Sequence, residues 1–353
     1  MATNPTGALT YADWARRQDP DGKEAVIVEL LSQTNEIMDD MLIMEGNEPT
    51  GHRTTVRTGL PSATWRLFNY GVPTTKSTTA QIRDSIGMLE TYSVVDKDLA
   101  DLNGNTNEFR FSESQAFLEG MSQQQASTVI YGNTAVNPER FMGFAPRYNT
   151  VSTTTAQTAY NVIDGLGTQS VNTSLWLICW GANTVAGIFP KGSVAGLQHK
   201  DWQDQRQIYD TNTPVGRYEG YTDHYQWKLG LSQRDWRYTV RLCNVDTSST
   251  SPGLLSTTPI NLINAMVRMV HRLPTAPASA APVQSDDAPT PSMVKKCAFY
   301  CNRLLSTYLD IQALNKTNVL LQMMQWDGRP VTTFRGIPVR TVDAILSNET
   351  RIT

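Results

Sequence analysis

The segment from residue 51 to 95 constrains the fold of this chain more than any other. It holds three β-forming stretches, punctuated by glycine and proline: the alternating pattern of Thr54, Val56 and Thr58, and the runs Trp65-Arg66-Leu67-Phe68 and Tyr92-Ser93-Val94-Val95. This pattern predicts a long two-stranded ribbon. A lone hairpin is marginally stable in water and cannot bury both of its faces within its own domain. We therefore expect the ribbon to rest on another chain.

An acidic segment precedes the ribbon. Apolar residues recur at three- and four-residue spacing from Glu24 to Glu45, which predicts an amphipathic helix that ends at Gly46. The other face of this helix is rich in carboxylates and the ribbon is rich in arginine, so we expect the two to pair; a merely solvated face is the alternative. The residues predicted to make contacts between subunits are Glu29, Glu36, Asp39, Asp40, Arg53, Arg57, Arg66 and Arg83.

The middle of the chain has the pattern of an α+β fold. Ser112 is followed three residues later by Gln115, a capping-box signature, and we expect a long helix with many small residues from there to Tyr131. Short strands and aromatic-rich loops are expected from about residue 150 to 273. Among them, Leu175–Trp180 is the clearest candidate for a fully buried strand.

The last third of the chain is expected to return to regular structure around a proline-rich interruption. A helix is predicted after Thr258, with Pro259 at its first position and Pro274 ending it. Residues 274–292 are rich in proline, alanine and serine, a composition typical of an exposed flexible loop. The remaining predicted elements are a helix through Leu304, Leu305, Leu309 and Leu314, strands at 319–325 and 331–334 joined at Asp327-Gly328, and a final strand at 337–342.

Length and charge exclude several classes of protein. The 353 residues suggest about two domains, and a hydrophobic content of 40% is enough for a folded core. Charged residues make up only 18% and the formal net charge is −3, so the chain lacks the cationic field that holds duplex DNA tightly. No apolar run approaches the ~20 residues that a bilayer requires. We expect a soluble chain that is not exported by a signal peptide and has no membrane partner.

Motifs for catalysis, metals and cofactors are missing from the sequence. There is no GxGxxG or GxxxxGK[ST] pattern, and the four histidines stand far apart without an HExxH pair. The four cysteines, Cys179, Cys243, Cys297 and Cys301, are too few and too scattered for a disulfide scaffold, so we expect reduced and mostly buried thiols. These observations predict a protein that is not an enzyme and that has no metal, no cofactor and no catalytic residues.

One enzymatic alternative stays open. Folding could bring His199 or His224 beside Asp201, Asp204 or Asp223, and such acid–base pairs are invisible in one dimension. Surface hydrogen bonding is the simpler role for these histidines.

Two stretches resemble a known family. The run Trp180–Ser193, continuing through Ala195-Gly196-Leu197, looks like the middle of tailed-bacteriophage major capsid proteins, and Phe334–Leu346 resembles the strand with which many of those proteins end. Together with the order of the predicted elements, the resemblance covers nearly the whole chain. The family is the Hong Kong 97-type capsid fold, and the chain is similar to coat proteins of short-tailed phages of Salmonella and Bordetella.

The resemblance implies a division of the chain. Residues 1–50 would form an N-arm and residues 51–95 an extended β-loop. A peripheral domain at 96–150 would contain a spine helix at 112–131, and an axial domain at 151–325 would include the flexible loop 274–292. The C-terminal strands at 326–353 would return to the peripheral domain.

The resemblance also implies a function. The protein would be the major capsid protein of a tailed phage and would self-assemble as hexamers and pentamers into the icosahedral virion shell. This shell would form in the cytoplasm of the host bacterium and enclose the double-stranded DNA genome. Further implied partners are scaffolding, portal and decoration proteins, and packaged DNA held by weak non-specific contact. An encapsulin-like compartment of the same fold is the alternative. Some capsids of this family join a loop lysine to an asparagine of a neighbour; Lys76 is the only lysine at 51–95, and a merely solvated Lys76 is the simpler reading.

Overall fold

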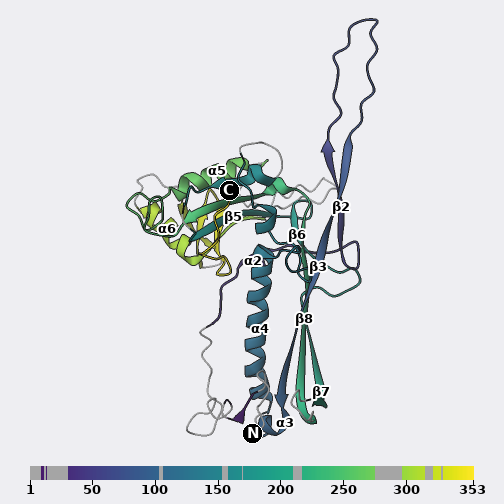
Figure 1. Ribbon diagram of the computed structural model, residues 1–353, viewed down its shortest axis with the longest axis vertical. Helices are drawn as coiled ribbons and strands as arrows, with labels where there is room; N and C mark the ends of the chain where they lie inside the picture. Colours follow the sequence, from purple (N-terminus) through teal and green to yellow (C-terminus); the bar gives the residue numbers. More distant parts are fainter. Residues whose placement is uncertain are drawn as a thin grey trace. The chain divides into compact units, whose positions relative to one another are not determined.

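The computed structural model describes residues 9–11, 13, 31–102, 106–152, 158–168, 170–209, 217–274, 296–314, 321–326 and 329–353. The chain folds into two compact units, each built from three separate stretches. The smaller unit takes residues 1–34, 88–127 and 196–228, and the larger unit takes 35–87, 128–195 and 229–353. Helices and strands occur in both units, which confirms the α+β class (Figure 1).

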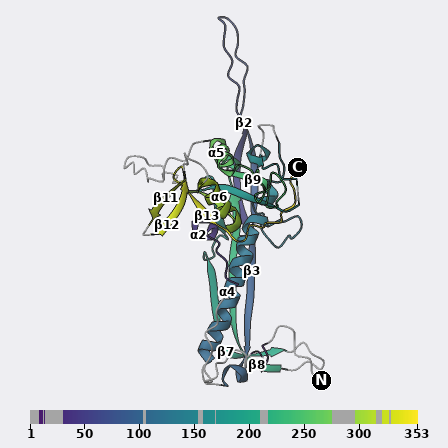
Figure 2. The same cartoon turned by 90° about the vertical axis from the view of Figure 1, so that its left-hand side faces the viewer.

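The larger unit is built on a mixed sheet around β5 (Asn172–Trp180). All nine residues of β5 are buried, which confirms the buried strand predicted for Leu175–Trp180 and extends it by three polar residues. Strands β10 (Lys296–Cys301) and β9 (Thr239–Asp246) pair with it in antiparallel orientation. Beyond β10 the order continues through β13 (Ile337–Thr341), β12 (Arg329–Phe334) and β11 (Leu321–Trp326), which confirms the three predicted C-terminal strands (Figure 2). This unit also contains β1 (Ile43–Glu45) and β6 (Val185–Phe189), which pair in parallel, and β4 (Val162–Asp164), which is parallel to β9.

Two helices pack on this sheet. Helix α5 (Leu262–Arg272) contributes Ile263, Met266 and Val270 to the apolar core, and α6 (Arg303–Leu314) contributes Leu305 and Leu309. Helix α5 begins three residues later than predicted, because the side chain of Asn261 accepts a hydrogen bond from the backbone N–H of Asn264 and caps it. Of the proline-rich segment 274–292, all but Pro274 lies outside the described residues.

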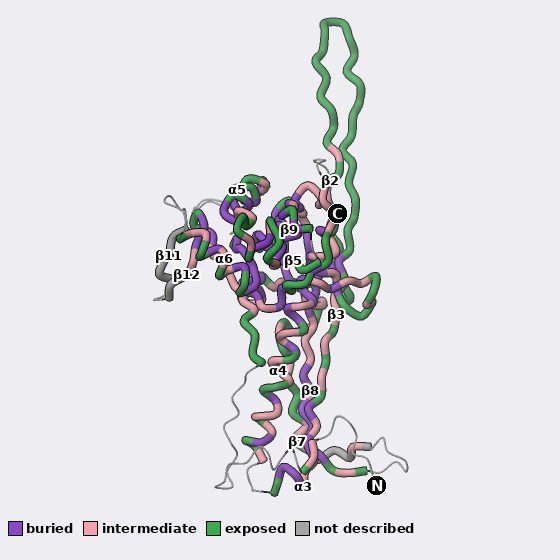
Figure 3. Tube along the Cα trace, turned by 60° about the vertical axis from the view of Figure 1, so that its left-hand side comes forward, coloured by how far each residue is buried: buried purple, intermediate pink, exposed green. Residues whose placement is uncertain are grey.

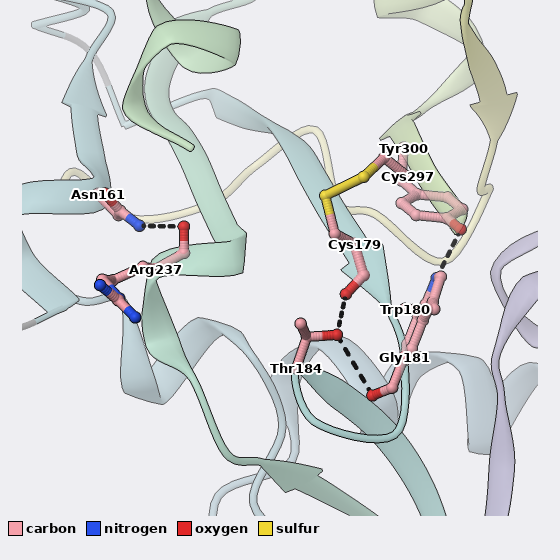
Figure 4. The surroundings of a disulfide bond; sticks show 8 residues. All are labelled: Asn161, Cys179, Trp180, Gly181, Thr184, Arg237, Cys297 and Tyr300. Carbon is pink, nitrogen blue, oxygen red and sulfur yellow. Dashed lines mark hydrogen bonds between the residues drawn. A yellow bond between two sulfur atoms is a disulfide. The ribbon is translucent and has the colours of Figure 1, made fainter. Parts of the chain in front are cut away.

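The central strands of the larger unit carry a disulfide. Cys179 and Cys297 are register partners on β5 and β10, and the structure joins them (Figure 4). The expectation that all four thiols are reduced is therefore wrong for this pair. The two cysteines are 118 residues apart, and only the pairing of β5 with β10 brings them together. Cys243 and Cys301 are free, and burial raises the pKa of each thiol to about 12.

Polar contacts of buried side chains surround the disulfide. Trp180 Nε1 donates to the hydroxyl of Tyr300 at 2.8 Å, which ties β5 to β10 a second time (Figure 4). Thr184 Oγ1 donates to the carbonyl oxygen of Cys179 at 2.7 Å and closes the turn that leads into β6. Tryptophan and tyrosine are usually buried only where their polar atoms find such partners.

The predicted ribbon is present in the larger unit. Strands β2 (Gly51–Gly59) and β3 (Thr78–Asp96) are antiparallel, with paired residues from Gly51 and Ser85 to Gly59 and Thr78. The register shifts between Arg57 and Gly59. Residues 60–77 connect the two strands. The sequence pattern identified the ribbon, but the β-forming stretch Trp65–Phe68 lies in this connection and is not a strand.

The smaller unit contains most of the long helix α4 (Thr106–Tyr131) and the antiparallel pair β7 (Leu197–Tyr209) and β8 (Arg217–Gln233). The short helix α3 (Lys97–Ala100) packs through Ala100 against Val95 and Phe109. The predicted helix end at Tyr131 is confirmed, but the predicted start at Ser112 is wrong. Ser112 lies inside the helix, where its hydroxyl donates to the carbonyl of Phe109 at 3.1 Å instead of capping.

The prediction of one long helix over Glu24–Glu45 is wrong for the part of it that the structure describes, residues 31–45. In this part only the four residues of α2 (Ile37–Asp40) are helical, and Ile43–Glu45 form strand β1. Asn35 also forms an isolated bridge with Val342. Pairing with β6 and with the C-terminal residues therefore overrides the local helical periodicity.

Candidate assembly surfaces

Residues 60–77, here called the hairpin tip, present an exposed apolar surface. Every residue from 60 to 83 is exposed, and Figure 3 shows both arms of the hairpin in the colour of exposed residues. Trp65 is 101% exposed and Phe68 97%. The other large apolar side chains exposed here are Leu60, Leu67, Tyr70 and Val72. Exposed clusters of apolar side chains usually mark sites of protein–protein contact.

A groove of about 1200 Å³ lies at the root of the hairpin, within the larger unit. Residues 53–60 of β2 and the adjoining loop line it together with residues 233–237. Asn183, Arg147 and Ile82 are also part of its lining. We call this feature the root groove.

Three carboxylates neutralise part of the positive charge around the root groove. Glu48 binds both Arg53 and Arg83, at 2.8 and 3.0 Å. The buried carboxylate of Asp84 lies 2.9 Å from Arg147 Nη2, and Asp235 accepts two hydrogen bonds from Arg237 at 2.9 and 2.8 Å. These contacts fix the arginine side chains, because a carboxylate and a guanidinium bind in a defined planar geometry.

Two further arginines of the root groove have no carboxylate among the described residues within ion-pairing distance. These are Arg57 and Arg234. Arg234 donates to Asn183 Oδ1 at 3.1 Å, and its Nη2 lies 2.7 Å from Nε2 of His52. Burial lowers the pKa of His52, and the charge of Arg234 lowers it further. The described residues in and around the root groove thus carry more arginines than carboxylates.

The acidic candidates Glu36 and Asp40 have cationic partners in the C-terminal half of the same chain. Lys296 Nζ lies 2.5 Å from Asp40 Oδ1, and Arg340 lies 3.3 Å from Asp40 and 3.8 Å from Glu36. The hydroxyl of Tyr300 also donates to Asp40, at 3.1 Å. The ribbon arginines are not their partners within the subunit, and their contacts between subunits stay predictions.

The structure separates the other described contact candidates into three places: the root groove, the hairpin tip and α2. Arg53 and Arg57 line the root groove, and Arg83 shares Glu48 with Arg53. Arg66 lies on the hairpin tip and is exposed, and Asp39 lies within α2 and is exposed. Glu29 lies outside the described residues. Sequence reasoning missed Arg147, Arg234 and Arg237, because nothing in the local pattern shows that these loops face β2.

A second polar cluster lies in the smaller unit. Asp201 and Asp223 are register partners on β7 and β8, where like charges repel. Nη2 of Arg110, on α4, lies 2.6 Å from Asp201 and 3.0 Å from Asp223, and His199 Nε2 lies 3.0 Å from Asp223. The structure thus brings His199 beside Asp223, one of the aspartates named from the sequence, and places Arg110, which the sequence did not indicate, in contact with both Asp201 and Asp223. His224 lies elsewhere in the unit, stacked on Tyr92 with ring centroids 4.5 Å apart.

Arg110 gives the cluster a structural explanation. Arg110 pairs with both aspartates, so the arrangement holds α4 against β7 and β8. The side chain of Asp204 is outside the described part of the chain. Among the described residues there is no group of three or more His, Cys, Asp or Glu side chains that could hold a metal ion. No helix among the residues that the structure describes is long and apolar enough to span a membrane.

Comparison with known proteins identifies the family. The family model of major capsid protein GP7 matches residues 19–353. The chain belongs to this family of phage capsid proteins. A chain in the near-atomic structure of bacteriophage Epsilon15 is 32% identical over the full length of both chains, with a TM-score of 0.74. No curated protein matches this capsid protein.

More distant structures share fewer residues. The capsid of bacteriophage JBD30 is 8% identical, with 90% of this chain and 92% of that one covered and a TM-score of 0.45. A chain of the SrpI encapsulin complex from Synechococcus elongatus is 11% identical, with coverages of 68% and 98% and a TM-score of 0.43.

The family match confirms what the two resembling stretches implied. The capsid protein has the Hong Kong 97-type fold, and it is the major capsid protein of a tailed phage and a component of the virion. It builds an oligomeric icosahedral shell. The domain boundaries drawn from the sequence stay predictions.

Proposed function

We propose that the capsid protein assembles as hexamers and pentamers into the shell that encloses a double-stranded DNA genome, with the hairpin tip of each subunit seated on a neighbouring subunit. Assembly takes place in the cytoplasm of the host bacterium. In this proposal the protein is a structural component that has no catalytic site of its own.

The observation that carries this proposal is the exposure of Trp65 and Phe68. A hairpin of this length is marginally stable by itself in water, and these side chains have almost no contact with their own subunit. Burying a large apolar side chain contributes about 1.5–3 kcal/mol. A neighbouring subunit that covers the hairpin tip would therefore gain binding energy and order the hairpin at the same time.

Hexamers and pentamers require one sequence to serve in two surroundings. Closed shells are built from repeated contacts between identical chains, and a contact made by an extended hairpin tolerates small rotations of the subunit body. The hairpin tip supports this requirement because it reaches beyond the packed core of the larger unit.

The test is a hairpin-trimmed variant. Gly59 and Thr78 are register partners, so residues 60–77 can be replaced by Asn-Gly, a sequence that favours a two-residue hairpin turn. We expect this variant to fold and unfold like the wild type, because residues 60–77 have no buried member, but to form no closed particles in sedimentation or electron microscopy. A matched control replaces Thr74 and Thr75 by serine and should assemble normally. Wild-type yields of closed shells from the trimmed variant would contradict the proposal.

The charge of the chain bears on its contact with packaged DNA. With a formal net charge of −3, the capsid protein is suited to weak and non-specific contact with packaged DNA, since a tight grip on phosphate would hinder packaging and release. Scaffolding, portal and decoration proteins are the other partners that we propose. Nuclease-protected DNA inside purified particles would support a genome container, whereas a protein cargo without DNA would favour an encapsulin-like compartment.

A further inference from the structure

The root groove has a charge that its own subunit leaves unbalanced. Arg53, Arg57, Arg147, Arg234 and Arg237 line it, and the only carboxylate in its described lining is Asp235. The carboxylates of Glu48 and Asp84 reach Arg53 and Arg147 from outside the lining. Arg57 and Arg234 are left without a carboxylate among the described residues.

The guanidinium groups also have unused hydrogen-bond donors. The Nε atoms of Arg147 and Arg234 are buried and have no hydrogen-bond partner among the described residues. A buried donor without a partner costs about 1–3 kcal/mol, so an acceptor that enters the groove would recover that energy. The threonines Thr54, Thr55 and Thr58 add hydroxyl groups to the same lining. Guanidinium and hydroxyl donors around a hollow fit carboxylate or phosphate oxygens.

We propose that the root groove receives a carboxylate-bearing segment of a second copy of the capsid protein, so that neighbouring subunits are joined by ion pairs at the root of the hairpin as well as by apolar contacts at its tip. This inference rests on the proposed function, because it takes the hairpin to be a contact between subunits.

Distance supports a single partner for both surfaces. Eleven residues separate Arg57 from Phe68, which corresponds to at most about 36 Å of extended chain. A compact body of the size of the larger unit, residues 35–87, 128–195 and 229–353, has a radius of gyration of about 18 Å, and so is wide enough to cover the root groove and the hairpin tip together.

Charge favours a protein partner over DNA. The whole chain has a formal net charge of −3, although the root groove is positive, so the rest of each subunit is acidic on balance. A second copy therefore offers carboxylates to the groove, whereas the same acidic surface would repel a DNA duplex. DNA bound in the groove is the outcome that the test must be able to reveal.

The test couples the groove chemically to its occupant in assembled shells. Arg57→Lys places an amine in the groove, and a carbodiimide joins an amine to a carboxylate only when the two are in contact. Shells are assembled from a mixture of isotopically heavy and light subunits, coupled, digested and analysed by mass spectrometry. The matched control is Arg303→Lys, because Arg303 pairs with Asp343 of its own chain at 2.9 Å.

The two variants should give different isotope patterns. We expect Lys at position 57 to yield peptides that join a heavy chain to a light chain, about as often as it joins two chains of the same kind. Lys at position 303 should join only peptides of the same isotopic kind. Lys at position 57 that couples only within its own chain, or to no carboxylate, would overturn the proposal.

A second measurement uses the wild-type chain. Phenylglyoxal modifies accessible arginines, and we expect Arg57 to react about tenfold more slowly in shells than in free subunits, while Arg303 reacts at similar rates in both. Shells assembled without DNA are then compared with shells that contain DNA. Protection of Arg57 that appears only with DNA would assign the groove to phosphate and reject the second copy. Both measurements start from assembled shells, so their failure leaves the result of the hairpin-trimmed variant unaffected.

Discussion

Arg241 and Glu349 form an ion pair in the interior of the larger unit. The distance between Arg241 Nη2 and Glu349 Oε2 is 2.9 Å, and the two side chains are only 4% and 6% exposed. Ser174 accepts a further hydrogen bond from Arg241 Nε at 3.0 Å, and the hydroxyl of Tyr131 donates to Glu349. Burial raises the pKa of Tyr131, and the charge of Glu349 raises it further, so this hydroxyl stays protonated. The C-terminal residues are thus joined to β5, β9 and the end of α4.

Removing one charge of this pair should destabilise the subunit strongly. Glu349→Ala leaves the buried guanidinium of Arg241 without its anion, and such a change costs about 3–5 kcal/mol of unfolding free energy. Denaturant unfolding followed by tryptophan fluorescence measures the loss. Arg303→Ala is the control, because Arg303 is 70% exposed and its pair with Asp343 contributes about 0–1 kcal/mol. Equal unfolding midpoints for the two variants would show that the buried pair does not stabilise the fold.

Reduction of the disulfide should weaken the larger unit. The bond between Cys179 and Cys297 closes a chain segment of 118 residues and restricts the unfolded state. We expect a reducing agent to lower the unfolding free energy of the wild type by about 2–4 kcal/mol. A variant with Cys179→Ala and Cys297→Ala should show the lower stability from the start and no response to the reducing agent. A wild type that does not respond would indicate that the bond is absent or without effect.

Acid should destabilise the larger unit through His52. The pKa of His52 is lowered in the folded state by burial and by Arg234, so below its ordinary value of 6.5 the unfolded chain binds more protons than the folded one. Stability from this residue is therefore present above about pH 6.5 and is lost as the pH falls below it. The melting temperature of the wild type should drop between about pH 7.5 and pH 5.5, and His52→Gln should drop less. The same pH dependence in both proteins would exclude His52 as the cause.

Lys76 is expected to form no covalent bond to a neighbour. Formation of an amide with an asparagine needs a buried carboxylate base, and no carboxylate among the described residues of its own subunit lies within ion-pairing distance of Lys76. Denaturing electrophoresis of mature shells should give a single band near the chain mass of 39.2 kDa. A ladder of linked subunits that disappears in Lys76→Arg would overturn this expectation.

The sequence predicted those elements whose pattern is local. The run Leu175–Trp180 is apolar on both faces and forms the buried strand β5, and the alternation from Thr54 to Thr58 forms β2. The final strand and the helix through Leu305 and Leu309 were likewise predictable from periodicity. In β5 and α6 the residues that set the pattern also make the contacts that bury the element, whereas Thr54 and Val56 of β2 are only half-buried and Thr58 is exposed.

The errors arose where distant residues decide the structure. Ile43–Glu45 fit a helical stripe, but β6 offers them a parallel partner, and the strand pairing prevails. Cys179 and Cys297 become neighbours only through the register of β5 and β10. The root groove has the same origin, because Arg57 and Arg234 lie far apart in the sequence and only the folded larger unit brings them to one hollow.

An electron cryomicroscopy map of assembled wild-type shells tests the central claim most directly. If subunits complete one another through the hairpin, the map should show Trp65 and Phe68 of every subunit packed against a neighbouring chain, with residues 60–77 as well ordered as the strands that carry them. Hairpins that extend into solvent, or that touch only their own subunit, would contradict the account.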